Sequence, residues 1–428
     1  MYCQLEVLRH CFPSSVRRIL EELPESLDET YERILREIRK PNQGHAHRLL
    51  QCLVAAVRPL EVKELAEILA FDFNTEGIPK LNLGWRWEDQ EEAVMSACSS
   101  LVMIVKDEDS RVVQFSHFSV KEFLTADRLA EPIRDISRYH IRPEAAHTIL
   151  VQACLGVLLQ LDDRIDGDSI KNFPLARYAA QHWATHARIE NVSSRIKDGM
   201  GCLFDADKPH FAAWLWIYNE DRWTDPTSPI RPEKPEAPPL YYAARLGFRD
   251  LAEHLIAEHP QDVTARGGLE VTPLHVAAFA GHSDILSLLI KHGADMNVQS
   301  VSGVTPLHRA SAYGRLEAGQ LLLDRGADVN VQNDHNIAAL VYATANGHVE
   351  FVRMLLDSGA LIDTRGYYGK TALHWAAENG QIGIARLLLE HGADVNVRDE
   401  DGNTPSQSGR GRQEVVELLS AYAKSVDE

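Results

Sequence analysis

The chain has 428 residues, of which 62 are acidic and 44 are basic, so its formal net charge is −18. A single core stops growing at about 250 to 300 residues, so this length predicts two or three domains. The negative charge excludes a nucleic-acid binder that relies on a basic face, because neutralisation of phosphates supplies most of that affinity.

The first predicted element is an amphipathic helix that ends before Pro41. Ser26 is followed three residues later by Glu29, which is the spacing of a capping box, and apolar residues then recur at helical spacing up to Ile38. Pro41 ends the helix because proline cannot continue it.

Residues 41–130 are expected to form a winged-helix-like domain. Apolar runs flank the acidic turn from Asp107 to Ser110, and this pattern predicts a β-hairpin. Helices are expected at Gly44–Val57, Glu61–Leu69, 88–100 and 119–130. Three helices, a hairpin and a closing helix are the order of a winged helix.

The charge of the second of these helices argues against DNA recognition. Glu61, Glu64 and Glu67 would make this helix acidic, whereas a recognition helix needs positive charge beside the phosphates. We therefore expect no nucleic-acid partner.

A helical segment over residues 131–224 and a Pro-rich linker over 225–237 are expected next. His182 and His186 are four residues apart, as two zinc ligands on one helix face would be. Trp183 stands where the H-E-x-x-H motif needs a glutamate, so we expect structural histidines and no metal. Prolines at every third position favour a stiff polyproline II spacer in the linker.

The last part of the chain, residues 238–428, repeats with a period of 33 residues. The equivalent positions are Thr272, Thr305, Ala338, Thr371 and Thr404. About six repeats are expected, each with two antiparallel helices and a projecting turn, because a repeat of this kind buries its apolar face only by stacking on its neighbours.

These repeats resemble ankyrin repeats, whose signature T-P-L-H-x-A reads Thr272-Pro273-Leu274-His275-Val276-Ala277. The threonine suits a helix N-cap and the proline suits the first helical position. The fourth repeat departs from the signature, since Ala338, Ala339 and Val341 replace threonine, proline and histidine. The lost cap is worth about 1 kcal/mol, so this repeat is expected to be the weakest joint of the stack.

The segments "LPESLDETYERIL", "LLQCLVAAVRPLEVKELAEILAF" and "VVQFSHFSVKEFL" are similar to the region downstream of the nucleotide-binding domain in fungal NACHT-ankyrin proteins of the STAND class. The resemblance implies that residues 1–40 are the helical tail of a nucleotide-binding module. It also implies that His117 corresponds to a histidine held to contact bound ADP. A satisfied structural histidine is the alternative, because no P-loop precedes residue 40 and "GYYGKT" at residues 366–371 lacks the first glycine.

The remaining motifs exclude several classes of protein. The chain has no G-x-S-x-G, no H-E-x-x-H and no Walker lysine, so we expect no catalytic residues, no enzyme activity and no cofactor. Six cysteines without a C-x-x-C pair are typical of a reduced cytoplasmic protein. No apolar run approaches about 20 residues, so no membrane partner is expected.

The function expected from these features is protein binding on the concave face of the repeats. The candidate contact residues, taken from the turn tips and the ends of the first helices, are Phe279, Tyr313, Asp334, His335, Tyr367, Tyr368, Glu378, Asn379, Glu400 and Asp401. Exposed aromatics beside acids suit a protein partner with a basic rim, although packing against a neighbouring turn is an equal alternative for Phe279 or Tyr313.

Three interpretations of the whole chain remain open. The first is a non-enzymatic sensing module of a NACHT-ankyrin signalling switch. The second is a free-standing ankyrin adaptor or scaffold. The third is a fragment of an ATPase whose P-loop domain lies upstream.

Overall fold

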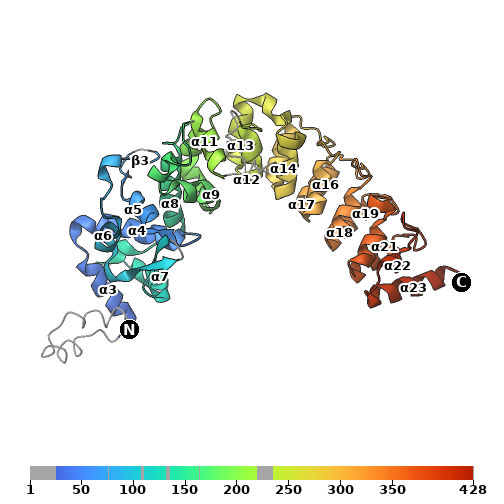
Figure 1. The fold of residues 1–428 in the computed structure, drawn as a ribbon, viewed down its shortest axis with the longest axis horizontal. Helices are drawn as coiled ribbons and strands as arrows, with labels where there is room; N and C mark the ends of the chain where they lie inside the picture. The colour runs from blue at the N-terminus through green and yellow to red at the C-terminus, as the bar shows by residue number, and fades with distance from the viewer. Residues whose placement is uncertain are drawn as a thin grey trace. The chain divides into compact units, whose positions relative to one another are not determined.

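The computed structural model describes residues 26–75, 77–107, 110–131, 135–162, 164–218 and 235–427. The chain divides into two compact bodies, residues 1–234 and 235–428 (Figure 1). The expected mainly α fold is confirmed in both. Most of the expected tail 1–40 and linker 225–237 lies outside the described residues, which include only 26–40 and 235–237 of them.

From residue 26 on, the described part of the N-terminal body begins with four helices and a small sheet. The helices are α3 (Leu27–Glu37), α4 (Gln43–Ala55), α5 (Val62–Ile68) and α6 (Gln90–Cys98). The strands β1 (Leu60–Glu61), β4 (Val102–Asp107) and β5 (Ser110–Phe115) form an antiparallel sheet in the order β1-β5-β4, and α7 (Phe118–Thr125) follows. A separate two-stranded ribbon pairs β2 (Phe71–Asp72) with β3 (Lys80–Leu81).

Local sequence explains the ends of these elements. The Ser26 hydroxyl accepts a hydrogen bond from the Glu29 amide at 3.2 Å, which caps α3. In β5, Val112 and Val113 are buried, and Val113 pairs with Ile104 of β4. The predicted hairpin is therefore present, and it packs its apolar residues against the helices.

Four more helices complete this body. They are α8 (Pro143–Leu158), α9 (Ala176–Ala187), α10 (Lys197–Leu203) and α11 (Pro209–Tyr218). Helix α8 packs against α4 on one side and α9 on another, which explains why it is apolar on most of its surface. Trp183 and Trp214 pack edge to face with ring centroids 5.8 Å apart where α9 contacts α11.

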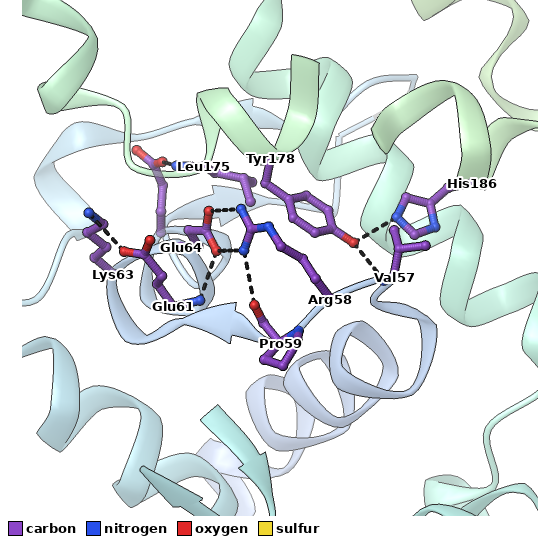
Figure 2. A network of polar contacts seen from close by, with 10 residues as sticks. Val57, Arg58, Pro59, Glu61, Lys63, Glu64, Leu175, Tyr178 and His186 are labelled. Atoms are coloured by element: carbon purple, nitrogen blue, oxygen red, sulfur yellow. Dashed lines mark hydrogen bonds and ion pairs between the residues drawn. The ribbon is translucent and has the colours of Figure 1, made fainter. Parts of the chain in front are cut away.

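Two buried carboxylates fasten α5 within this body. Arg58 donates two hydrogen bonds to Glu64, at 2.8 and 2.7 Å, and Glu64 also accepts the Glu61 amide at 2.8 Å (Figure 2). Glu67 pairs with Arg86 and accepts the Leu175 amide at 2.7 Å. The expectation that α5 presents an acidic surface is therefore wrong for Glu64 and Glu67, because both are buried.

The C-terminal body is a stack of six helix pairs, here called repeats 1 to 6. The first helices are α12 (Pro239–Leu246), α14 (Pro273–Ala280), α16 (Pro306–Ala312), α18 (Ala339–Ala345), α20 (Ala372–Glu378) and α22 (Pro405–Ser408). The second helices are α13 (Arg249–Glu258), α15 (Ser283–Lys291), α17 (Leu316–Asp324), α19 (Val349–Asp357), α21 (Ile382–Glu390) and α23 (Gln413–Asp427). First helices contact first helices and second helices contact second helices along the stack.

The Thr-Pro-Leu-His signature explains how the first helices start. Thr305 is extended at the N-cap of α16, and its hydroxyl accepts the His308 amide at 3.4 Å. The His308 ring nitrogen Nδ1 accepts the Thr305 amide at 3.0 Å, which completes a capping box. Thr272 and Thr371 do the same with their own histidines. Ala338 at the start of α18 makes no side-chain cap bond.

Five short turns project between consecutive repeats, and we call them fingers 1 to 5. They are residues 267–271, 300–304, 333–337, 366–370 and 399–403. Each is closed by a hydrogen bond from its first amide to its last carbonyl, at 2.9 to 3.1 Å. The position two residues before each N-cap has a positive φ in every finger, and Gly303, Gly369 and Gly402 occupy it in three of them.

Candidate protein-binding surface

Fingers 3, 4 and 5 bring six of the ten candidate residues together. Asp334 and His335 lie on finger 3, Tyr367 and Tyr368 on finger 4, and Glu400 and Asp401 on finger 5. All six are exposed. The fingers follow one another because the repeats stack, so residues 33 apart in sequence become neighbours in space.

Tyr367 and Tyr368 form an exposed aromatic pair. Their ring centroids are 4.1 Å apart, and 45% of Tyr367 and 55% of Tyr368 is accessible to solvent. The His335 and Tyr367 rings meet edge to face, with centroids 5.8 Å apart. The fingers therefore present a continuous aromatic strip of three rings.

The backbone of Tyr368 is held in a conformation that disfavours a side chain. Its φ is 57° and its ψ is 27°, in the left-handed region. This region costs a non-glycine residue roughly 1–2 kcal/mol relative to its ordinary conformation. A large ring that is exposed and also strained contributes little to folding, so Tyr368 is a candidate for contact with another molecule.

Acidic side chains border the aromatic strip. The pKa of Tyr368 is raised by its hydrogen bond to Tyr367 and further by the negative charges of Asp401 and Glu400. An aromatic face beside carboxylates attracts a cation through both the ring quadrupole and the charge.

Beside finger 4, one cation of the chain itself is already held between an aromatic ring and a carboxylate. The Lys370 ammonium lies 5.0 Å from the Trp375 ring centroid and 2.6 Å from a Glu378 carboxylate oxygen. Glu378 is therefore engaged within the chain. Asn379 is also engaged, because its amide donates to the Ala345 carbonyl at 3.2 Å. Both residues are exposed, but they join neighbouring parts of the array.

Phe279 and Tyr313 occupy a second aromatic site on repeats 2 and 3. Their rings meet edge to face with centroids 4.4 Å apart, and Arg245 lies 5.9 Å from the Phe279 centroid. Phe279 is half-buried and 46% of Tyr313 is exposed. Packing against a neighbouring repeat therefore accounts for Phe279, whereas Tyr313 remains partly available.

His117 lies at the N-cap of α7 on an exposed turn. Its Nδ1 accepts the Ser119 amide at 3.3 Å and lies 2.6 Å from the Ser119 hydroxyl. Its ring lies 4.3 Å from Phe118, of which 72% is exposed. This capping contact gives His117 a structural role.

His182 and His186 share a face of α9, where both rings contact Tyr178, and His186 is buried in a polar network. Its Nδ1 lies 2.9 Å from Nδ1 of His147, and its Nε2 lies 2.9 Å from the Tyr178 hydroxyl (Figure 2). Burial, aided by the nearby His147 and His182, lowers the pKa of His186 to about 3. Within the described ranges, no three His, Cys, Asp or Glu side chains are grouped so that they could hold a metal.

Sequence reasoning missed an exposed aromatic loop in the N-terminal body. Leu83, Trp85 and Trp87 are each at least half exposed. Arg86 between them is anchored by Glu67, and its guanidinium lies 5.7 Å from the Phe173 centroid. The alternation W-R-W, in which a half-buried arginine stands between two exposed tryptophans, was the signal that could have revealed it.

In the segments between residues 26 and 427 that the structure describes, each helix is either too short or too polar to cross a bilayer.

Comparison with known proteins matches the two parts of the chain to two different families. Residues 31–133 match the family model described as GPI inositol-deacylase, winged helix domain. Residues 240–333 and 328–399 match the model of ankyrin repeats.

Two curated proteins share parts of the sequence. Azaphilone pigments biosynthesis cluster protein L of Monascus ruber is 34% identical over 289 residues, which cover 63% of this chain and 60% of that protein. Alpha-latrocrustotoxin-Lt1a of Latrodectus tredecimguttatus is 37% identical over 67 residues, 16% of this chain and 4% of the toxin. The chain thus spans less than two thirds of the length of either relative. The N-terminal body contains a winged helix of the GPI-inositol-deacylase type, and the C-terminal body consists of ankyrin repeats.

Proposed function

We propose that this chain is a non-enzymatic protein-interaction module, in which fingers 3, 4 and 5 on the concave face hold a partner protein. Ankyrin repeats are surfaces for protein binding in general. The observation that carries the proposal is the exposed Tyr367–Tyr368 pair, whose rings are 4.1 Å apart and whose second member is held in a left-handed conformation.

The chemistry of the strip defines the kind of partner. Aromatic rings bordered by Asp334, Glu400 and Asp401 suit a protein segment that presents a lysine or arginine next to an apolar side chain. Two backbone groups of fingers 3 and 4 support the same location. Among the hydrogen bonds of residues 235–427, none uses the Tyr367 amide or the His335 carbonyl, so both can bond to a partner.

We further propose that the module is regulatory and corresponds to the C-terminal part of a NACHT-ankyrin switch in the cytoplasm. The winged-helix match supports this role. Within the N-terminal body, Arg58 and Tyr178 tie the winged helix to α9, since the Arg58 guanidinium lies 4.9 Å from the Tyr178 centroid and the Tyr178 hydroxyl accepts the Val57 amide at 3.2 Å. A displacement of α9 would therefore act directly on the start of α5.

A scaffold for biosynthetic proteins is the second function that we propose. The Monascus relative is named for a pigment biosynthesis cluster, and 63% of this chain aligns with it. A scaffold needs the same finger surface but no switch. The fragment of an ATPase is the third interpretation, and it requires a nucleotide site that the proposal does not include.

A comparative capture experiment tests the finger surface. The full chain, the variant Tyr367→Ala/Tyr368→Ala and the variant Leu361→Ala are used as baits in extract from the source organism, and bound proteins are quantified. Leu361 is the matched control because 63% of it is exposed and it lies away from the fingers. We expect at least one protein to be lost by the double variant and kept by the control. Equal recovery on all three baits would contradict the proposal.

Calorimetry with ATP separates the third interpretation from the first two. We expect no heat of binding from the purified chain, because its only partial phosphate-loop match, residues 366–371, is finger 4 and the start of α20. Micromolar binding would favour the ATPase fragment.

A further inference from the structure

The interface between repeats 4 and 5 lacks a side-chain bond that neighbouring interfaces share. Between repeats 2 and 3, 3 and 4, and 5 and 6, a histidine Nε2 lies close to the carbonyl that closes the next finger, at 2.9 Å for His275 and Val304, 3.0 Å for His308 and Ile337, and 3.1 Å for His374 and Asn403. In repeat 4 the equivalent residue is Val341, which is buried and apolar. The Lys370 carbonyl of finger 4 therefore receives no such bond.

A backbone bond is missing at the same interface. Finger 2 is bonded to finger 1 through the Val301 amide and the Leu269 carbonyl at 3.1 Å. Corresponding bonds join finger 3 to finger 2 at 3.2 Å and finger 5 to finger 4 at 3.0 Å. Between fingers 3 and 4 the corresponding pair is the Tyr367 amide and the His335 carbonyl, and no bond joins them in the described part of the array.

Buried polar atoms without partners gather in these two repeats. They are Thr344 Oγ1 in α18, Trp375 Nε1 in α20 and Gln381 Oε1 at the start of α21. The residue equivalent to Thr344 in repeat 3 is Ser311, whose hydroxyl donates to the His308 carbonyl at 2.9 Å. Each unpaired buried atom lowers stability by its desolvation cost, so this interface is weaker than its neighbours.

The opposite edge of the interface remains fastened. The Asp394 amide donates to Asp363 Oδ1 at 3.2 Å, as the Asp328 amide does to Asn297 at 2.9 Å between earlier repeats. His391 Nε2 also lies 3.6 Å from Asp357 Oδ1. Hydrogen bonds between repeats 4 and 5 are therefore missing at the fingers. They are present at the opposite edge, which we call the loop side because it is formed by the loops that follow α19 and α21.

We propose that the array opens between repeats 4 and 5 on the finger side, with the loop side as the pivot. Once this interface has separated, repeats 5 and 6 lose their packing on repeat 4. They then unfold together as one cooperative element, while repeats 1 to 4 remain folded. In a stack where each repeat contacts only its neighbours, the weakest interface sets the boundary between cooperative elements. The proposal concerns the fold of the array and stands whether or not the fingers bind a partner.

Hydrogen exchange of the full chain tests this boundary. We expect the amides of α20 and α21 to exchange at one common rate, at least about tenfold faster than those of α16 and α18. Fraying from the C-terminus would instead give faster exchange in α23 than in α21 and no step between α18 and α20. That pattern, or equal protection across repeats 3 to 5, would overturn the proposal.

Two variants sharpen the measurement. Ala338→Thr with Val341→His restores the cap and the imidazole that can reach the Lys370 carbonyl, and it should slow exchange in α20 and α21 about tenfold without changing α14. Thr305→Ala with His308→Val removes the same groups from repeat 3, and it should bring α18 into the fast-exchanging element. The second variant inserts no larger side chain into repeat 4, so it remains decisive if histidine does not fit there. Unchanged exchange in α18 in this variant would refute the proposed origin of the joint.

Discussion

The left-handed conformation of Tyr368 lowers the free energy of unfolding, and this loss can be measured. Replacing it with glycine removes the strain of a side chain at φ 57°, so we expect the free energy of unfolding to stay constant or rise by up to about 1 kcal/mol. The same change removes the exposed ring and should reduce capture of the partner. Denaturant midpoints and the capture experiment give the two readouts. A loss of stability above about 1 kcal/mol would instead show that the ring supports the fold.

The cap histidines predict a dependence of stability on pH. Burial lowers the pKa of His275 and of His308 to about 4, whereas histidine in an unfolded chain titrates near 6.5. Between these values the unfolded chain binds more protons, so the free energy of unfolding falls as the pH is lowered from about 6.5 to about 4 and is constant above. Each histidine should contribute on the order of 3 kcal/mol to this loss at the acid limit.

Repeat 6 supplies the control for this pH dependence. Gln407 occupies the histidine position there, and its Oε1 accepts the Thr404 amide at 2.9 Å without titrating. His308→Gln should therefore make the decrease in unfolding free energy between pH 7.5 and pH 5 less steep, while His275 still contributes its own share. A decrease as steep as that of the unaltered protein would show that other groups cause it.

For single residues, the sequence predicted those contacts that form between positions close together in the chain. Thr305, Pro306 and His308 are three positions of one turn, so their capping contact follows from spacing alone. The burial of Glu64 does not, because it depends on Arg58 folding back over α5. A carboxylate six residues from an arginine is just as compatible with an exposed helix face.

The Arg58–Glu64 pair provides a test at the scale of elements, where it joins the segment before β1 to α5. Only 3% of the Glu64 side chain is exposed, so Arg58→Met leaves a buried carboxylate without its cation and should cost about 3 kcal/mol of unfolding free energy. The double variant Arg58→Met/Glu64→Leu should recover much of this loss, because the charge is removed with its partner. Equal costs for the single and the double variant would mean that the pair is not coupled.

Element order was predictable where periodicity is strong. The helix pairs follow from the 33-residue phase, and the hairpin β4–β5 follows from two apolar runs around an acidic turn. The contact of His186 with His147 could not be predicted, since it depends on how α9 packs against α8. The aromatic strip on fingers 3 and 4 was accessible to sequence reasoning because stacking aligns residues 33 apart.

The division into two bodies makes a prediction for the whole molecule. Each body has its own buried core, with Trp183 and Trp214 in the first and residues such as Leu289 and Leu355 in the second. Residues 235–428 expressed alone should therefore be helical by circular dichroism and unfold cooperatively. Residues 1–234 should give a separate transition. Loss of helical signal in the isolated C-terminal body would show that it depends on the first.

The closing bond of each finger has an evolutionary consequence. Because every finger is tied by its own amide and carbonyl four residues apart, the residues at its tip contribute nothing to the closure. Outside the position of positive φ, substitution of a side chain at one tip therefore leaves the closing bonds of the remaining fingers intact. If the fingers bind a partner as proposed, a lineage carrying this array could exchange one partner for another through substitutions at single tips, without passing through misfolded intermediates.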